Sequence, residues 1–206
     1  MKMRLMPRTM WIVFKPSFQK QLSVFGASDP QKVMSNAKVK YQEIVSGIPP
    51  FEENDVLLIT LLNAATLAAI YLSLDERPSP EQVTRYYDAA MSDSFVMRTF
   101  LKSSKYYSKS YQRSLARQAQ RSQNSTNPYS WKFRFVAGPS LDCFDAIFDQ
   151  CGICKLFLKL GISEITPAMC AYDYGMAKWT KTEFSRQYTL ASGGAVCDCH
   201  YRKTKE

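Results

Sequence analysis

The pattern of hydrophobic and polar positions predicts helices in the first part of the chain. Residues 30–46 mix apolar and polar positions as an amphipathic helix does, and Asp29 is placed to cap the first turn. Residues 79–91 have the same character, and they begin with Ser79 and Pro80, residue types that open helices. Both segments are expected to pack one face against a common core.

Residues 56–74 form an uncharged apolar segment that is almost long enough to cross a membrane. Acidic residues flank it on both sides, no excess of Lys or Arg orients it, and Asn63 and Thr66 interrupt its apolar surface. These features favour a helix buried on all sides at the centre of the fold over a membrane span.

Residues 94–123 contain no acidic residue and predict a helix with a basic face. Seven basic residues recur three or four positions apart: Arg98, Lys102, Lys105, Lys109, Arg113, Arg117 and Arg121. This spacing places them on one side of a helix, where like charges repel unless an anionic group lies beside them. We favour a basic face neutralised within the fold over a nucleic-acid site, which would bind with a steep dependence on salt.

After a polar linker at residues 123–128, helical and alternating segments follow one another. The expected segments are a strand at 129–136, helices at 144–160 and 166–179, and strands at 184–190 and 195–201. The turn at Gly193 and Gly194 lies between the last two segments, so these are expected to form an antiparallel hairpin.

These elements predict an α+β fold in which a helical N-terminal half precedes a small antiparallel sheet with packed helices. The 206 residues, 46% hydrophobic and 22% charged, suffice for one domain with its own core. We therefore expect a single domain over residues 1–206, mainly helical at 1–125 and α+β at 126–206. The net charge of +9 bears on partners and solubility and not on the fold.

The cysteines gather in the last third of the chain, whereas a secreted disulfide framework would be spread more evenly. The six are Cys143, Cys151, Cys154, Cys170, Cys197 and Cys199. The longest apolar run near the N-terminus, residues 11–14, is too short for the core of a signal peptide. We expect free thiols and a cytoplasmic location.

Candidate chemistry lies among these cysteines and the polar residues near them. Cys170 and Asp173 are three positions apart in an expected helix and so share a face. If Cys197 on the last strand meets that face, the site holds two thiols and a carboxylate, with Arg186 available for a substrate carboxylate. A buried structural thiol and an ordinary salt-bridge arginine are the alternatives.

Other uses of the sulfur atoms are less well supported. Two cysteine pairs, 151/154 and 197/199, could supply four thiolates to zinc, but the spacing differs from that of zinc ribbons. The CGIC sequence matches a redox pair only where a strand runs into a helix within a βαβ topology, and the mainly helical chain before it does not provide one. His200, the only histidine, alternates away from Cys197 and Cys199.

The last third of the chain resembles the L-2-amino-thiazoline-4-carboxylic acid hydrolase family. The resemblance rests on residues 148–177 and 184–203, with a cysteine-bearing helix, a "C..D" pair and an "R..T…GG..CD" ending. The matching positions are Cys151, Gly161, Glu164, Pro167, Cys170, Asp173, Arg186, Thr189, Gly193, Gly194, Cys197 and Asp198. Cys199 departs from the pattern, since the family usually has Phe there.

The resemblance implies a hydrolase without a cofactor that opens a small cyclic isothiourea, 2-aminothiazoline-4-carboxylate or a related heterocycle, on a route to cysteine. In that view Cys170 or Cys197 is the nucleophile, and Asp173 holds the amidinium or handles protons. Substrate binding falls to the remaining polar residues of the motif, which are Arg186, Thr189, Gly193, Gly194 and Asp198. A water activated by Asp173, with the thiols only lining the pocket, is the alternative mechanism.

A second class of function fits the same ending. It is similar to the small-molecule-binding domains related to bacteriochlorophyll vinyl reductases, which sense a ligand without hydrolysing it. In either case we expect a small-molecule partner, no metal and no membrane, and a homodimer could bury the apolar central helix. Cys170, Asp173 and Arg186 in one place would favour the enzyme.

Overall fold

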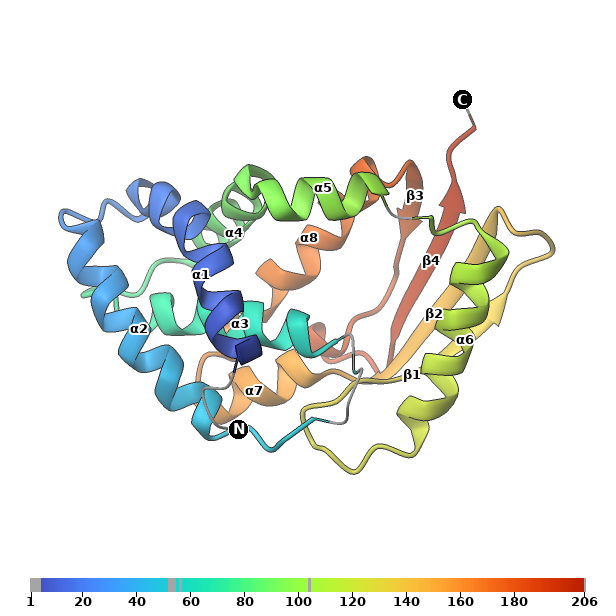
Figure 1. Ribbon diagram of the computed structural model, residues 1–206, viewed down its shortest axis with the longest axis horizontal. Coiled ribbons are helices and arrows are strands. Elements are labelled where there is room, and N and C mark those ends of the chain that lie inside the picture. Colours follow the sequence, from blue (N-terminus) through green and yellow to red (C-terminus); the bar gives the residue numbers. More distant parts are fainter. Residues whose placement is uncertain (1–4, 52–54, 56, 104, 206) are drawn as a thin grey trace.

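The computed structural model describes residues 5–51, 55, 57–103 and 105–205, and it joins a group of helices to a four-stranded sheet at one end (Figure 1). The helices are α1 (Leu5–Lys20), α2 (Pro30–Ser46), α3 (Leu58–Tyr71), α4 (Pro80–Asp93), α5 (Phe95–Ser103), α6 (Lys109–Gln123), α7 (Gly152–Leu160) and α8 (Thr166–Trp179). The strands are β1 (Lys132–Ala137), β2 (Cys143–Gln150), β3 (Thr182–Ser185) and β4 (Cys197–Lys203). The expected α+β class is confirmed.

Two predicted helices begin where their capping residues indicated. The side chain of Asp29 accepts a hydrogen bond from the N–H of Lys32 at 2.9 Å, which satisfies one free donor in the first turn of α2. At α4, Ser79 and Gln82 exchange bonds between side chain and backbone, 3.3 Å in one direction and 2.9 Å in the other. Local sequence therefore fixes both starts.

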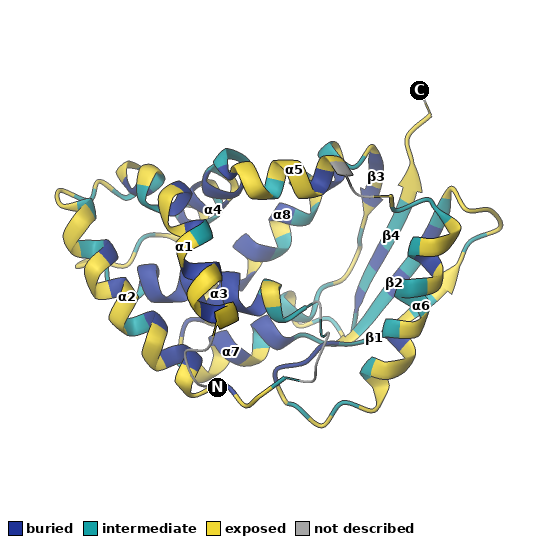
Figure 2. Ribbon diagram, viewed as in Figure 1, coloured by how far each residue is buried: buried dark blue, intermediate teal, exposed yellow. Residues whose placement is uncertain are grey.

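The central helix is α3, and it is buried on nearly every side. Leu61, Leu67 and Ile70 are at most 1% exposed, and Figure 2 shows most of the helix in the colour of buried residues. It packs against α1, α2 and α7. The prediction of a buried core helix is confirmed, and among the described residues no helix has both the length and the apolar character needed to span a membrane.

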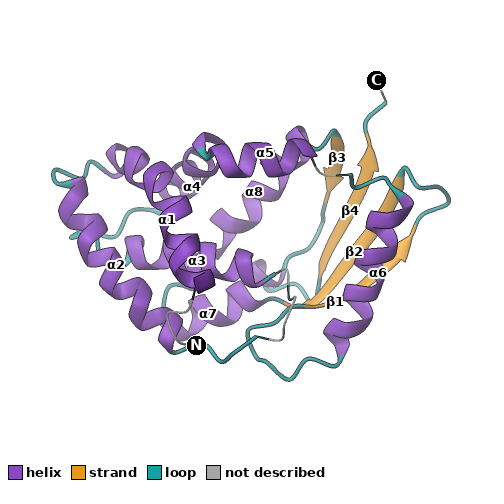
Figure 3. Ribbon diagram, in the orientation of Figure 1, coloured by secondary structure: helices purple, strands orange, loops and turns teal. Residues whose placement is uncertain are grey.

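The sheet has the strand order β1-β2-β4-β3, and all neighbouring strands are antiparallel (Figure 3). One face carries Phe144, Phe148 and Tyr201 and packs against α6 and α8. On the other face lie alternate residues such as Asp145 and His200, which are half-buried. The sheet is therefore covered on one side, as expected for an antiparallel sheet with alternating apolar and polar positions.

The predicted helix at residues 144–160 is wrong in its first half. Residues 143–150 form β2, and only residues 152–160 form a helix, α7. Phe144 and Ala146 are buried in the core, whereas Asp145 between them is not. β2 also pairs with β4 from Cys143 to Phe148. Pairing with a strand some fifty residues later is a nonlocal interaction, and it overrides a local pattern that fits a helix as well.

The prediction of one continuous basic helix is also wrong, because the segment forms two separate helices, α5 and α6. Tyr107 donates a hydrogen bond to the side chain of Thr182 at 2.9 Å, and Tyr106 packs edge-on against Tyr201. Ser108 then caps α6 by accepting from the N–H of Tyr111 at 3.3 Å. The seven basic residues therefore do not share one helix face.

The three alternating segments become strands with shifted bounds. β1 begins three residues later than expected, and β3 ends at Ser185 instead of residue 190. β3 and β4 pair antiparallel as predicted, but residues 186–196 between them form a long connection and not a tight hairpin turn. That connection carries several of the candidate site residues.

Candidate functional site

An ion pair joins α8 to the chain that follows β3. Nη1 of Arg186 donates to Oδ2 of Asp173 at 2.7 Å, and Nη2 donates to the carbonyl oxygen of Cys170 at 3.0 Å. The guanidinium also lies over the rings of Phe184 and Tyr174. The structure thus places Arg186 beside Asp173 and the backbone of Cys170, three residues whose co-location the sequence analysis named as favouring an enzyme.

The two partners of this pair differ in exposure. The side chain of Arg186 is only 6% exposed, whereas that of Asp173 keeps 31% of its surface. Burial raises the pKa of Asp173, and Arg186 opposes that shift without cancelling it. Within the described part of the chain no hydrogen bond engages Oδ1 of Asp173, so this oxygen can accept one from a ligand.

Cys197 begins β4 and faces the same side of the sheet as Cys199. Its sulfur accepts a hydrogen bond from the N–H of Leu190 at 3.2 Å. Both thiols are buried, and they pack with Phe184 and with Ala177 of α8. Cys197 therefore packs against α8, the helix that carries Cys170 and Asp173, which is the arrangement that the sequence analysis posed as a condition for a site with two thiols.

The residues between β3 and β4 form a short 3₁₀ turn, η3 (Leu190–Ser192), bounded by Thr189 and Gly193. Thr189 accepts from the N–H of Ser192 at 3.0 Å, and Gly193 has a positive φ of 82°. Gly194 lies so close to the turn that a Cβ there would be 2.9 Å from the carbonyl oxygen of Thr189. The N–H groups of both glycines bond within the turn. These three predicted binding residues thus shape the loop beside Cys197.

Asp198 lies on the opposite side of β4 from Cys197. Its carboxylate accepts from the N–H of Gln187 at 3.2 Å and of Tyr188 at 2.5 Å, and it lies 3.5 Å from Nε2 of His200. These bonds from the backbone lower the pKa of Asp198 against the effect of burial. The structure does not bring Asp198 together with Cys170, and its visible role is to fix the start of the connection between β3 and β4.

The CGIC sequence occupies the point where β2 runs into α7 (Figure 1). Cys151 is the N-cap of α7 with an extended backbone, at φ −124° and ψ 120°. At position 152 only glycine fits, because a Cβ there would overlap the carbonyl oxygen of Tyr129. Cys154 follows in the first turn, with its side chain hydrogen-bonded to Cys151.

Cys151 is the thiol best prepared to ionise. The hydrogen bond from the Cys154 side chain and bonds from the backbone N–H groups of Cys154 and Ile153 together lower its pKa, although burial opposes them. Burial raises the pKa of Cys170 to about 12, and the nearby charge of Asp173 adds to this effect. Burial likewise raises the pKa of Cys197. The electrostatics therefore point to Cys151 and not to the two thiols chosen from the sequence.

Four thiols influence one another's pKa through their charges when ionised, and they are here called the thiol cluster. They belong to Cys151, Cys154, Cys170 and Cys197. The charge of Asp173 also acts on Cys151, Cys170 and Cys197. Sequence reasoning did not select Cys151, although the alternation of residues 144–148 and the small Gly152 were signals of a strand ending at a helix. Among the described residues, no three His, Cys, Asp or Glu side chains are arranged to hold a metal ion.

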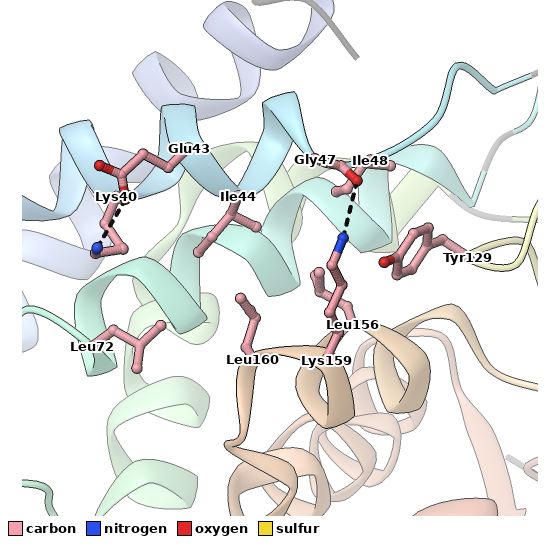
Figure 4. Close-up of a pocket in the computed structure, with 10 residues that line it drawn as sticks. All are labelled: Lys40, Glu43, Ile44, Gly47, Ile48, Leu72, Tyr129, Leu156, Lys159 and Leu160. Atoms are coloured by element: carbon pink, nitrogen blue, oxygen red, sulfur yellow. Dashed lines mark hydrogen bonds and ion pairs between the residues drawn. The ribbon is translucent and has the colours of Figure 1, made fainter.

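A separate groove of about 390 Å³ lies between α2, the end of α3 and α7 (Figure 4). Its walls are apolar side chains such as Ile44, Leu156 and Leu160. Its two lysines are both engaged, Lys40 with Glu43 at 2.8 Å and Lys159 with the carbonyl oxygen of Gly47 at 3.4 Å. No residue of the thiol cluster lines it.

The fold and site define an α+β protein in which a partly buried carboxylate–guanidinium pair joins α8 to the chain after β3, with several thiols nearby. The model of the L-2-amino-thiazoline-4-carboxylic acid hydrolase family matches residues 60–201, more than half of the chain, and the chain belongs to this family. The match spans the whole thiol cluster together with Asp173 and Arg186. Searches of curated proteins and of solved structures gave no match.

Proposed function

We propose that the protein is a hydrolase that opens a small cyclic isothiourea, with 2-aminothiazoline-4-carboxylate or a related heterocycle as its substrate. Membership in the family supports the reaction class. The observation that carries the proposal is the environment of Cys151, a thiol at a helix N-terminus whose pKa is lowered although the charge of Asp173 opposes that shift. Such a thiol is the kind of nucleophile that attack on an amidine carbon requires.

The reaction proceeds in two displacements at one carbon. The Cys151 thiolate adds to the ring carbon bonded to the sulfur and two nitrogens, the ring C–S bond breaks, and the departing sulfur takes up a proton. This leaves an isothiouronium linked to the enzyme. Water then adds to the same carbon and loses its protons, and the bond to Cys151 breaks. The product is N-carbamoyl-cysteine, and the thiolate is regenerated.

Asp173 and Arg186 have complementary roles in this proposal. Asp173 uses Oδ1 to accept a hydrogen bond from the amidinium of the substrate, since Oδ2 is held by Arg186. Arg186 is a positioning residue: it fixes Asp173 and the backbone of Cys170, and its positive charge attracts the carboxylate of the substrate. Cys170 and Cys197, with raised pKa values, stay protonated and line the site.

The test is turnover of 2-aminothiazoline-4-carboxylate by the purified protein, with N-carbamoyl-cysteine measured by chromatography and mass spectrometry. Cys151→Ser is expected to lower turnover by several orders of magnitude, up to roughly a millionfold, the loss seen when a protease loses its nucleophile. Cys143→Ser is the matched control, because Cys143 lies at the far end of β2, the strand that leads to Cys151, and outside the thiol cluster, so this variant should keep the activity.

Variants of the two other candidate nucleophiles, Cys170 and Cys197, complete the experiment. Loss of activity in Cys170→Ser or Cys197→Ser alone would return the nucleophile to those residues. Activity that survives in all three variants would favour a water activated by Asp173. A folded wild-type protein that turns over neither this compound nor its ring analogues would overturn the proposal.

One observation supports a second candidate function, a binding module. The groove of about 390 Å³ is lined mainly by apolar side chains, which suits a small apolar ligand. A ligand of that class should raise the melting temperature of the protein, and substitution of Leu160 by Asp should remove the shift. A shift that persists in Leu160→Asp would place the ligand elsewhere.

A further inference from the structure

Strand β2 and helix α7 create the context that the CGIC sequence needs for redox chemistry. The sequence analysis set this chemistry aside because the mainly helical chain before CGIC offered no strand-to-helix context with βαβ topology, but in the structure β2 ends at Gln150 and α7 begins at Gly152. β2 and β3 are each antiparallel to β4, so they run in the same direction, and α7 and α8 lie between them in the chain. Cys151 and Cys154 thus occupy the end of a strand and the first turn of the next helix.

The two cysteines lie on one turn of α7, three residues apart. Cys151 at the N-cap and Cys154 three residues later belong to the same turn of α7, and their side chains share a hydrogen bond. Side chains three apart at a helix start are close enough for a disulfide, which needs Cα atoms within about 7 Å. Both residues are half-buried, so a small reagent can reach this end of α7.

The surroundings of the pair favour a thiolate on Cys151 in particular. The N–H groups of Ile153 and Cys154 donate to its sulfur, as expected at a helix N-terminus. The hydrogen bond to Cys151 raises the pKa of Cys154, so the shared proton stays on Cys154 until Cys151 has reacted. The charge of Asp173 raises the pKa of Cys151 and so opposes this ionisation.

We infer that Cys151 and Cys154 form a dithiol–disulfide couple that exchanges with small disulfides such as oxidised glutathione. The Cys151 thiolate attacks one sulfur of glutathione disulfide, a mixed disulfide forms, and one glutathione leaves and takes up a proton. Cys154 then loses its proton, its sulfur attacks Cys151, and the second glutathione leaves. Two cysteine thiols are oxidised to one disulfide, and one glutathione disulfide is reduced to two thiols.

One consequence rests on the proposed function. The internal disulfide removes the thiolate that ring opening uses, so oxidation would switch the hydrolase off and reduction would restore it. The exchange itself does not depend on hydrolysis. A readout of thiols therefore tests the couple even if the protein has another substrate.

The experiment equilibrates the reduced full-length protein with mixtures of reduced and oxidised glutathione, quenches with acid and alkylates the free thiols. Trypsin releases residues 135–155 as one peptide, which holds Cys143, Cys151 and Cys154, while Cys170 and Cys197 fall in two other peptides. Oxidation is expected to yield this peptide with two hydrogens fewer and only Cys143 alkylated. Cys154→Ser is expected to retain glutathione on Cys151, because the second step is then blocked.

Two results would overturn the inference. One is a peptide that keeps all three cysteines alkylated even in oxidised glutathione alone. The other is a disulfide that links this peptide to the one containing Cys170 or Cys197. Cys143→Ser serves as the control, because it should leave the oxidation unchanged. The measurement on the wild-type protein stands even if Cys154→Ser fails to fold.

Discussion

The ion pair between Arg186 and Asp173 allows a quantitative test of how the site is held together. Arg186→Met keeps much of the aliphatic side chain that packs beside Phe184 but removes the cation. The substitution deletes the bond of 2.7 Å to Asp173 and the bond of 3.0 Å to the carbonyl of Cys170. Asp173 is then left as a mostly buried carboxylate without its partner.

Breaking a buried pair in this way costs about 3–5 kcal/mol. Because the side chain of Asp173 is 31% exposed, we expect the lower end of that range, about 3 kcal/mol near neutral pH. The folded protein has a raised Asp173 pKa, so stability tied to this group is greatest at acidic pH and falls as pH rises through that pKa. Loss of Arg186 raises the pKa further, so the penalty should shrink at acidic pH, where the protonated carboxyl needs no cation.

The assay is urea unfolding of a double-mutant cycle with Arg186→Met, Asp173→Asn and the combined variant, at about pH 7 and about pH 4.5. We expect a coupling of about 2–3 kcal/mol at the higher pH and a smaller one at the lower pH. A coupling below about 1 kcal/mol at both values, as exposed pairs give, would refute the reasoning that burial makes this pair important.

Two further substitutions test the positions that shape the fold around the site. Gly152→Ala should destabilise the protein by about 1–3 kcal/mol, because the new Cβ overlaps the carbonyl oxygen of Tyr129. The same substitution should slow alkylation of Cys151. An unchanged free energy of unfolding in urea would contradict this expectation. Ser79→Ala should cost about 1 kcal/mol by removing the cap of α4, whereas Ser79→Asp should not; equal losses in the two variants, measured by thermal unfolding, would show that the cap is unimportant.

Helices with local boundary signals could be predicted from the sequence. Asp29 and Ser79 cap α2 and α4 where expected, and Thr166 and Pro167 begin α8 at the predicted position. The uncharged character of α3 also predicted its central place. In each case the information lies within a few residues of the feature, so no knowledge of the tertiary fold is needed.

Features set by distant contacts were missed. β2 pairs with β4, and the break between α5 and α6 places Tyr107 against Thr182; both partners lie far along the chain. In the site, helical spacing predicted that Cys170 and Asp173 share a face, whereas Arg186 was joined to them only as a possibility. The special environment of Cys151 was not predicted, because it depends on where a strand ends and on hydrogen bonds that a sequence does not display.

The burial of α3 has a consequence for hydrogen exchange. A helix packed on nearly all sides cannot separate from its neighbours without exposing the centre of the fold. Local unfolding that would expose its amides therefore costs nearly as much free energy as global unfolding. The N–H groups of residues such as Leu67 and Ile70 should therefore exchange with solvent only when the whole protein unfolds. Their exchange rates would report the global free energy of unfolding directly, without any denaturant.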